Sequence, residues 1–321
     1  MIRLFACMVA LVGLAACQIL EGPVHDFPPA RPSGGCGTEG LAAGLHARTL
    51  SSQGQQRSYQ IFVPAGHEGP LPVVFNFHGF TSDGALQRGY SRMDVSASAH
   101  GYLAVYPEGV VGPEGTTSPF FGEGTRRFWA AGSCCGPVED APDDVLFFRQ
   151  MRDALAAEAC LDTRRVYVTG MSNGGFMAQR IACDAADVVA AAGSVTGVLG
   201  VSEDACKPSR PIPILQIFGG DDPAVPYSGE TRFITGEDSF AAWGRVHGCA
   251  SGPVRVWTEP RFFCEAFSGC AGDAEVQMCL LPGMGHCWPG PARKTTCSEA
   301  GTALDANDRL WSFFSRHALR D

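Results

Sequence analysis

The stretch that decides the fold is RVYVTGMSNGGFMAQRIAC, residues 165–183. Residues 166–169 (VYVT) are β-branched or aromatic, which favours a buried strand. Residues 176–182 (FMAQRIA) favour a helix. Between them, residues 170–174 (GMSNG) fit the pattern G-x-S-x-G, with Ser172 at the centre. This order predicts a tight turn that presents a serine at the carboxyl end of a strand.

Two further strand ends carry the partners that such a serine needs. A serine hydroxyl becomes a nucleophile when a histidine takes its proton and a carboxylate orients that histidine. After the expected strand PILQIF comes GGDDPAVPY, which offers Asp221 and Asp222. After EVQMCLL comes PGMGHCWPG, which offers His286. Because acid and base follow the serine in this chain order, we predict Ser172, Asp222 and His286 as the catalytic residues, with Asp221 as the alternative acid.

The same logic predicts the donors that would stabilise an oxyanion. Two backbone N–H groups are required, one from the residue after the nucleophile, Asn173, and one from the loop HGFTSDG that follows the strand VVFNF. We assign the second donor to Phe80, with Thr81 as the next choice. His78 precedes the acid in the chain, so we expect it to hydrogen-bond and support this loop rather than to act as the base.

Three residues next to these motifs are candidates for an apolar substrate cleft. They are Met171, Trp129 and Trp288. The alternative is that the aromatic side chains only pack the loops in which they lie.

Expected strands and helices alternate along the rest of the chain. Strand-like segments lie at 57–64, 71–79, 102–107, 188–197, 212–220 and 274–281, and helical ones begin at Asp143 and cover 240–246 and 306–319. This alternation predicts an α/β fold with a mainly parallel sheet and helices on both faces. The 321 residues, 45% of them hydrophobic, are enough for a single catalytic domain.

The N-terminal segment predicts export. Residues 1–16 combine a basic start with an apolar run that is shorter than the roughly 20 residues needed to span a bilayer. They lead into LAAC, which resembles a bacterial lipobox and predicts lipidation of Cys17; an ordinary secretory signal is the alternative. We therefore expect a protein attached to the membrane only through this lipid, facing the periplasm or the cell exterior. Residues 17–35 are expected to be a flexible tether, and 36–321 the catalytic domain.

The charge and the cysteines agree with this compartment. A net charge of −9 gives no electrostatic basis for binding nucleic acid. Twelve of the fourteen cysteines remain when Cys7 of the signal and Cys17 are left out, and an even number in an oxidising compartment predicts up to six disulfides that staple the loops. We expect the neighbours Cys134 and Cys135 to bond to two different partners, because a bond between adjacent residues strains the peptide.

Together these motifs resemble the polyhydroxybutyrate depolymerase and feruloyl esterase family of secreted α/β-hydrolases. The matching pieces are HGFTSDG, FWAAGSCCG, PDDVLFF, GMSNGG, FGGDDPAVPY, GMGHCWPG and ANDRLWSFFSRH. The resemblance implies the α/β-hydrolase fold, the triad named above and a histidine loop shaped by residues 288–290. This chain has Phe218 where the family commonly has histidine.

The resemblance implies an exported serine carboxylic-ester hydrolase that needs no cofactor and no metal. We expect polyhydroxyalkanoate (hydroxybutyrate) esters or oligomers as the substrate, cleaved through an acyl-enzyme. A feruloyl or acetyl-xylan esterase acting on polysaccharide esters is the alternative. A serine peptidase and a non-catalytic binding lipoprotein remain open as other classes.

Overall fold

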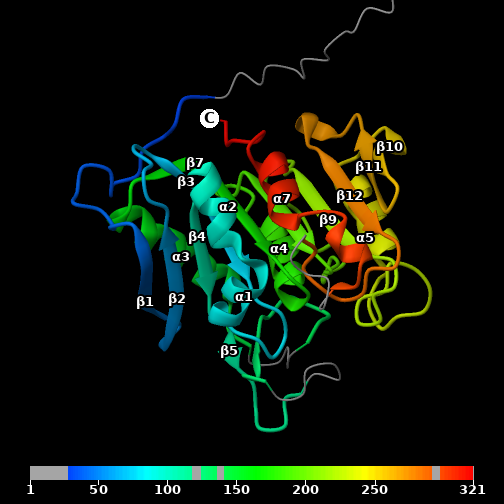
Figure 1. Cartoon of the computed structure of the whole chain (residues 1–321), viewed down its shortest axis with the longest axis horizontal. Coiled ribbons are helices and arrows are strands. Elements are labelled where there is room, and N and C mark those ends of the chain that lie inside the picture. Colours follow the sequence, from blue (N-terminus) through cyan, green and yellow to red (C-terminus); the bar gives the residue numbers. More distant parts are fainter. Residues whose placement is uncertain (1–27, 118–123, 136–140, 291–296, 321) are drawn as a thin grey trace, which may run out of the picture.

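The computed structural model describes residues 28–117, 124–135, 141–290 and 297–320. Its centre is a ten-stranded sheet in the order β1-β2-β4-β3-β7-β8-β9-β12-β11-β10 (Figure 1). The inner strands are β4 (Leu103–Pro107), β3 (Leu71–Phe77), β7 (Leu161–Gly170), β8 (Ala191–Val195), β9 (Ile214–Gly219) and β12 (Val276–Leu281). All neighbours within this inner block are parallel, so their carboxyl ends share one edge of the sheet.

Antiparallel strands flank this parallel block on both sides. β1 (Gly44–Ser52) and β2 (Gln55–Val63) flank β4, and β11 (Phe262–Ser268) and β10 (Ser251–Glu259) flank β12. A small separate ribbon pairs β5 (Val110–Val111) with β6 (Arg127–Phe128). Of these outer strands only β2 was predicted.

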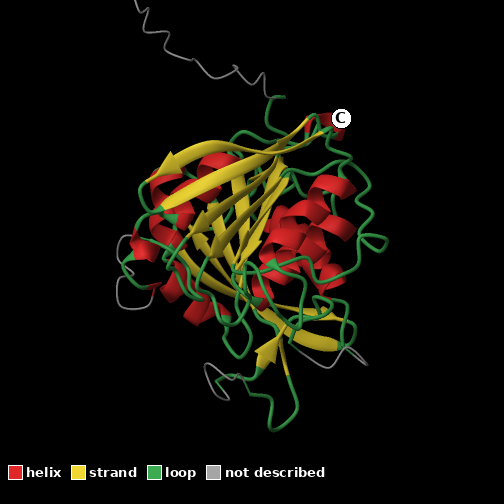
Figure 2. Cartoon of the chain, turned by 90° about the vertical axis from the view of Figure 1, so that its right-hand side faces the viewer, coloured by secondary structure: helices red, strands yellow, loops and turns green. Residues whose placement is uncertain are grey.

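Helices cover both faces of the twisted sheet, as Figure 2 shows. One core contains buried residues from α3 (Asp144–Glu158), α4 (Asn173–Asp184) and α5 (Gly236–Val246). The other contains residues from α2 (Met93–His100) and α7 (Ala306–Phe314), with α1 (Gly84–Ser91) nearby. Short 3₁₀ turns lie at Ala271–Asp273 and Ala300–Thr302. This is the predicted α/β-hydrolase fold, with a mainly parallel sheet between two helical layers.

The predicted helix start at Asp143 is confirmed. The Asp143 carboxylate accepts a hydrogen bond from the amide of Leu146 at 2.9 Å, which satisfies one of the free N–H groups at the start of α3. Phe148, Met151 and Leu155 are spaced along one face of this helix and are fully buried.

The twelve cysteines among the described residues form six disulfides, in agreement with the predicted number. Five join Cys36–Cys160, Cys183–Cys206, Cys249–Cys270, Cys264–Cys279 and Cys287–Cys297. The sixth joins the neighbours Cys134 and Cys135 to each other. Our expectation of two separate partners for this pair is wrong, since every other cysteine among the described residues is already bonded.

The last residues of the expected tether are bonded to the folded body. The amides of Ser33 and Gly35 donate hydrogen bonds to Leu161 and Ala156, and Arg31 donates to Asp162. The Cys36–Cys160 disulfide fixes the same segment to the start of β7. Residues 31–35 are therefore part of the folded body, because their backbone groups are paired with it. The rest of the signal and tether, including Cys17, lies outside the described residues except for 28–30.

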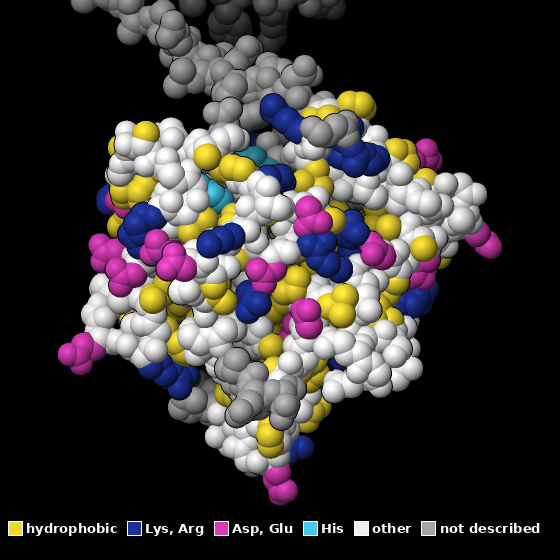
Figure 3. Space-filling view, turned by 180° about the vertical axis from the view of Figure 1, so that it is seen from behind, with side chains coloured by type: hydrophobic (Ala, Val, Ile, Leu, Met, Phe, Trp, Pro, Cys, Tyr) yellow, Lys and Arg dark blue, Asp and Glu magenta, His cyan; other side chains and the backbone are white. Residues whose placement is uncertain are grey.

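The surface mixes charges of both signs. Seen from behind in Figure 3, acidic and basic side chains are interspersed with small apolar groups. Among the described residues, none of the helices combines the length and apolarity required to cross a membrane.

Candidate active site

The turn at Ser172 joins β7 to α4 through strained backbone. Ser172 has φ 55° and ψ −124°, a region that L-amino acids rarely occupy. Its amide donates to Val195 O at 2.9 Å, which ties the turn to the end of the neighbouring strand β8. The side chain is half-buried at the carboxyl edge of the sheet. The predicted strand–serine–helix turn is present.

The flanking glycines are required by close backbone packing. A Cβ on Gly170 would lie 2.4 Å from the carbonyl oxygen of Gly174, and a Cβ on Gly174 would lie 2.1 Å from that of Phe77. Neither contact can be relieved by turning a side chain, because both partners are backbone atoms. The glycines of the motif thus allow β7, α4 and β3 to meet directly beneath the serine.

His286 and Asp222 meet at the same edge of the sheet. His286 Nδ1 lies 2.8 Å from Asp222 Oδ2, and both side chains are almost fully buried. The second oxygen of Asp222 accepts hydrogen bonds from the amides of Ala224 and Val225 at 2.8 and 2.9 Å. The adjacent Asp221 is exposed, and its amide donates to Met284 O. Of the two candidate acids, Asp222 is the one that contacts the histidine.

Ser172 and His286 line one cavity of about 510 Å³, which we term the active-site cavity. Cavities of this size accommodate small organic ligands. Most of its wall is apolar. The large contributors are Phe80, Leu86, Tyr90, Met171, Val225 and Phe233. Met171 thus lies where a substrate contact was expected.

The predicted oxyanion donors are the amides of Phe80 and Asn173, and the alternative to Phe80 is the amide of Thr81. They differ in whether the amide already donates a backbone hydrogen bond. The amide of Thr81 donates to Arg127 O at 2.8 Å, which removes it as a donor to a ligand. Within the described residues, the amides of Phe80 and Asn173 make no backbone hydrogen bond. Gly79 lies against Ser172, because a Cβ built on it would be 3.5 Å from Ser172 Cβ. The loop has a positive φ at Thr81 (59°).

His78 supports the loop from behind, as predicted. Its Nε2 accepts the Gly109 amide at 2.9 Å, so the proton is on Nδ1, which donates to Gly79 O at 2.7 Å. The C=O and N–H of a trans peptide point in opposite directions. Holding the Gly79 carbonyl toward the ring therefore directs the Phe80 N–H away from it. Burial lowers the pKa of His78 to about 4, which keeps the imidazole neutral.

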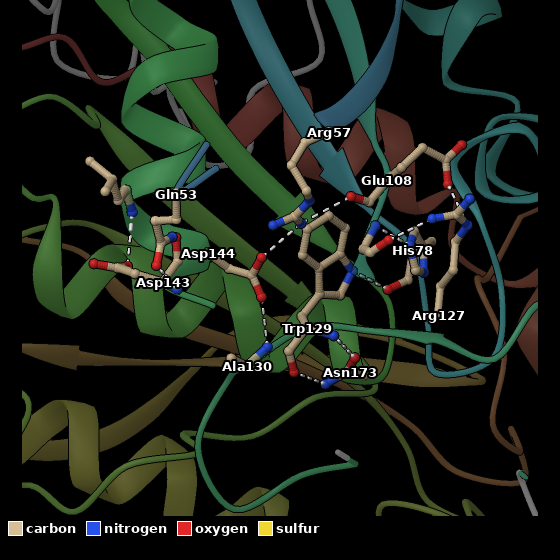
Figure 4. Close-up of polar contacts among 12 residues, drawn as sticks. Gln53, Arg57, His78, Glu108, Arg127, Trp129, Ala130, Asp143, Asp144 and Asn173 are labelled. Atoms are coloured by element: carbon tan, nitrogen blue, oxygen red, sulfur yellow. Dashed lines mark hydrogen bonds and ion pairs between the residues drawn. The ribbon is translucent and has the colours of Figure 1, made fainter. Parts of the chain in front are cut away.

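Trp129 does not line the active-site cavity and is fully buried. The expectation that it contacts substrate is therefore corrected. Its Nε1 donates to His78 O at 3.0 Å, and its backbone amide and carbonyl pair with the side chain of Asn173 at 2.7 and 3.1 Å (Figure 4). Trp129 thus links the two segments that carry the Phe80 and Asn173 amides.

A buried ion pair holds this link in place. Arg57 Nη2 lies 2.8 Å from Asp144 Oδ1, and the other carboxylate oxygen of Asp144 accepts the amide of Ala130 at 2.8 Å (Figure 4). The guanidinium also lies 5.8 Å from the Trp129 ring centroid. Burial raises the pKa of Asp144, while Arg57 and the Ala130 amide favour its charged form. No local pattern in the sequence indicates that Arg57 reaches the back of the active site.

Trp288 is also buried and does not line the cavity. Its amide lies 3.4 Å from the hydroxyl of Tyr90, and the preceding residue, Cys287, is bonded to Cys297. Trp288 therefore packs the histidine loop, which is the alternative given for the aromatic side chains, and its expected contact with substrate is corrected. Phe218 is buried in β9, where its ring packs against Tyr227.

Several cavity residues were missed in the sequence. Leu86 and Tyr90 come from α1, which was not predicted, and Arg232 and Phe233 come from the long loop before α5. The Cys134–Cys135 disulfide also lines the cavity. Asp83 followed by GALQ was a usable signal for α1, because Asp83 caps that helix through the amide of Leu86.

The fold defines an α/β-hydrolase, and the sequence matches identify its class as the carboxylic-ester hydrolases. The family model described as esterase PHB depolymerase matches residues 57–209. The NocK protein of Nocardia uniformis subsp. tsuyamanensis, which carries an esterase assignment, is 32% identical over 296 residues, covering 83% of this chain and 81% of that protein. The chain belongs to the polyhydroxybutyrate depolymerase and feruloyl esterase family.

Two other similarities agree. Feruloyl esterase B of Piromyces equi is 30% identical over 244 residues, which cover 72% of this chain and 42% of that longer protein. The chain thus spans less than half the length of that relative. The acetyl xylan esterase from Aspergillus awamori has a similar structure, with a TM-score of 0.55, 15% identity and coverage of 84% of this chain and 99% of that one. At this identity the likeness concerns the fold alone.

Proposed function

We propose that this protein is an exported serine esterase that cleaves hydroxybutyrate-type esters or oligomers through an acyl-enzyme. The observation that supports it best is the contact of His286 with Asp222 at the wall of a cavity that also contains Ser172. Membership of the family argues for ester hydrolysis. The apolar wall suits an aliphatic acyl chain of short length.

In the proposed mechanism, His286 Nε2 takes the proton of Ser172 while the serine oxygen attacks the ester carbonyl. Nε2 is the nitrogen that accepts this proton, because Nδ1 is engaged by Asp222. The amides of Asn173 and Phe80 stabilise the negative oxygen of the tetrahedral intermediate. His286 returns the proton to the leaving alcohol, and then activates the water that releases the acid and restores Ser172.

The test is the variant Ser172→Ala assayed on 4-nitrophenyl butyrate. We expect kcat to fall by about three orders of magnitude or more, since the nucleophile is lost. An unchanged circular dichroism spectrum is the control for folding. Turnover close to that of the unmodified protein would refute the serine mechanism.

A feruloyl esterase is the second candidate. The rings of Phe80, Tyr90 and Phe233 along the cavity wall also suit an aromatic acyl group. Comparing kcat/KM for hydroxybutyrate dimer, methyl ferulate and acetylated xylan separates the two. A clear preference for methyl ferulate or acetylated xylan would replace the first proposal.

Export and lipid attachment at Cys17 are also part of the proposal. The six disulfides support an oxidising compartment. If Cys17 is lipidated, Cys17→Ala moves the protein from the membrane fraction to the soluble fraction of cells that express it. An unmodified protein that is already soluble would contradict the anchor.

A further inference from the structure

Among the described residues that line the active-site cavity, Arg232 is the one whose side chain is permanently charged. Among the described residues that form its wall, only Arg232 and His286 carry groups that can be positively charged, and there is no carboxylate. The rest of the wall consists of apolar side chains, small residues, the Cys134–Cys135 disulfide and a few neutral polar groups. A single fixed cation beside an apolar surface is suited to a ligand that is mostly apolar and carries one negative charge.

Arg232 forms no ion pair with any acidic residue that the structure describes. Within the described part of the chain, no carboxylate lies at ion-pairing distance from its guanidinium. The side chain is exposed, so it can meet a ligand at the mouth of the cavity without a large loss of hydration. By contrast, Arg57 forms an ion pair with Asp144, and Arg245 forms one with Glu203.

The guanidinium is held beside the cavity by a neighbouring ring. Its Cζ lies 4.7 Å from the ring centroid of Phe233, which itself lines the cavity. Phe233 in turn packs edge-on against the buried Phe176 of α4, with the ring centroids 5.2 Å apart. The guanidinium of Arg232 is therefore held, through Phe233 and Phe176, against helix α4, which begins directly after Ser172.

We propose that Arg232 binds a free carboxylate of the substrate and so selects acidic esters. This inference rests on the proposed function and narrows it. A hydroxybutyrate oligomer has one carboxylate at its end, and the ester bond nearest to that end has an anion on its alcohol side. An arginine presents planar paired donors that match a carboxylate. The preferred substrates would then be short, acid-terminated oligomers, such as those that a polymer-degrading reaction supplies.

The experiment compares matched charged and neutral esters. On the alcohol side, the pair is 3-(butyryloxy)butyrate and its primary amide; on the acyl side, it is mono-4-nitrophenyl glutarate and 4-nitrophenyl valerate. For each pair, the ratio of kcat/KM for the charged ester to that for the neutral ester is measured in the unmodified protein and in R232Q, R232K and R320Q. Arg320 is exposed and lies near the C-terminus, so R320Q is the matched control for loss of one positive charge.

We expect R232Q to lower the ratio about fivefold for at least one pair, mainly through a higher KM for the charged ester. R232K should retain part of the preference for the charged ester, and R320Q should leave the ratio unchanged. Raising the salt concentration should lower the ratio in the unmodified protein. The pair that responds identifies the side of the ester on which the carboxylate binds. A ratio that is the same in R232Q as in the unmodified protein for both pairs overturns the inference, whereas hydrolysis of none of the four esters overturns the proposed esterase itself.

Discussion

Asp221 and Asp222 are neighbours in the chain with opposite surroundings. Asp222 is buried, contacts His286 and accepts two backbone amides, whereas Asp221 faces solvent. We predict that Asp222→Asn lowers kcat by about 10²-fold to 10⁴-fold, because an amide cannot hold the imidazole in the required tautomer. Asp221→Asn is the matched control and should stay within about twofold. Equal kinetics for the two variants would contradict the role given to Asp222.

Trp129 lies behind the active-site cavity and connects the segments that carry the two proposed backbone donors, Phe80 and Asn173. Trp129→Phe keeps a ring against Phe77 and removes the donor to His78 O. We expect kcat to fall several-fold with little change in KM, and the free energy of unfolding to fall by about 1–3 kcal/mol because the carbonyl is left unpaired. Trp311→Phe, on the opposite face of the sheet, is the control and should change stability only. An unchanged kcat in Trp129→Phe would show that Trp129 only packs the core and does not position the donors.

At the level of elements, the junction of β7 with α4 depends on glycine. Gly174→Ala places a Cβ 2.1 Å from Phe77 O, so we predict a loss of about 3 kcal/mol or more in the free energy of unfolding, together with lower kcat. Gly89, inside α1, has no atom within 4 Å of the position that a Cβ would take. Gly89→Ala should therefore raise stability by about 0.5–1 kcal/mol. Urea unfolding measures both changes, and a harmless Gly174→Ala would mean that the junction is looser than described.

The loop after β3 makes stability depend on pH through His78. Its pKa is about 4 in the folded protein against 6.5 in the unfolded chain, so the unfolded state binds more protons between these values. The neutral His78 side chain makes its full contribution to the free energy of unfolding above pH 6.5. As the pH falls to 4, the free energy of unfolding decreases by about 3 kcal/mol. His247, whose pKa burial also lowers, acts in the same direction.

The variant His78→Asn tests this prediction. Asparagine can donate to Gly79 O but does not titrate, so its stability should fall less steeply between pH 6.5 and 4 than that of the unmodified protein. Denaturant unfolding at several pH values gives the two slopes. Parallel curves would show that another group causes the loss.

Over the whole molecule, the parallel centre was predictable and much of the periphery was not. Near-continuous apolar runs at 71–77 and 214–219 identify buried strands, and the chain order of serine, acid and base follows from strand ends that share one edge. The β10–β11 hairpin and the pairing of Cys134 with Cys135 depend on which segments meet in space, which a single sequence does not encode locally. The same is true of Trp129, whose aromatic ring suits both a cleft and a core.

Treatment of the whole protein with a fluorophosphonate, followed by peptide mass mapping, tests the proposed serine site most directly. A serine made reactive by His286 and Asp222 should take one phosphonyl group per chain, located on the peptide that contains Ser172. Absence of an adduct, or an adduct on a different residue while ester turnover is lost, would contradict the site described above.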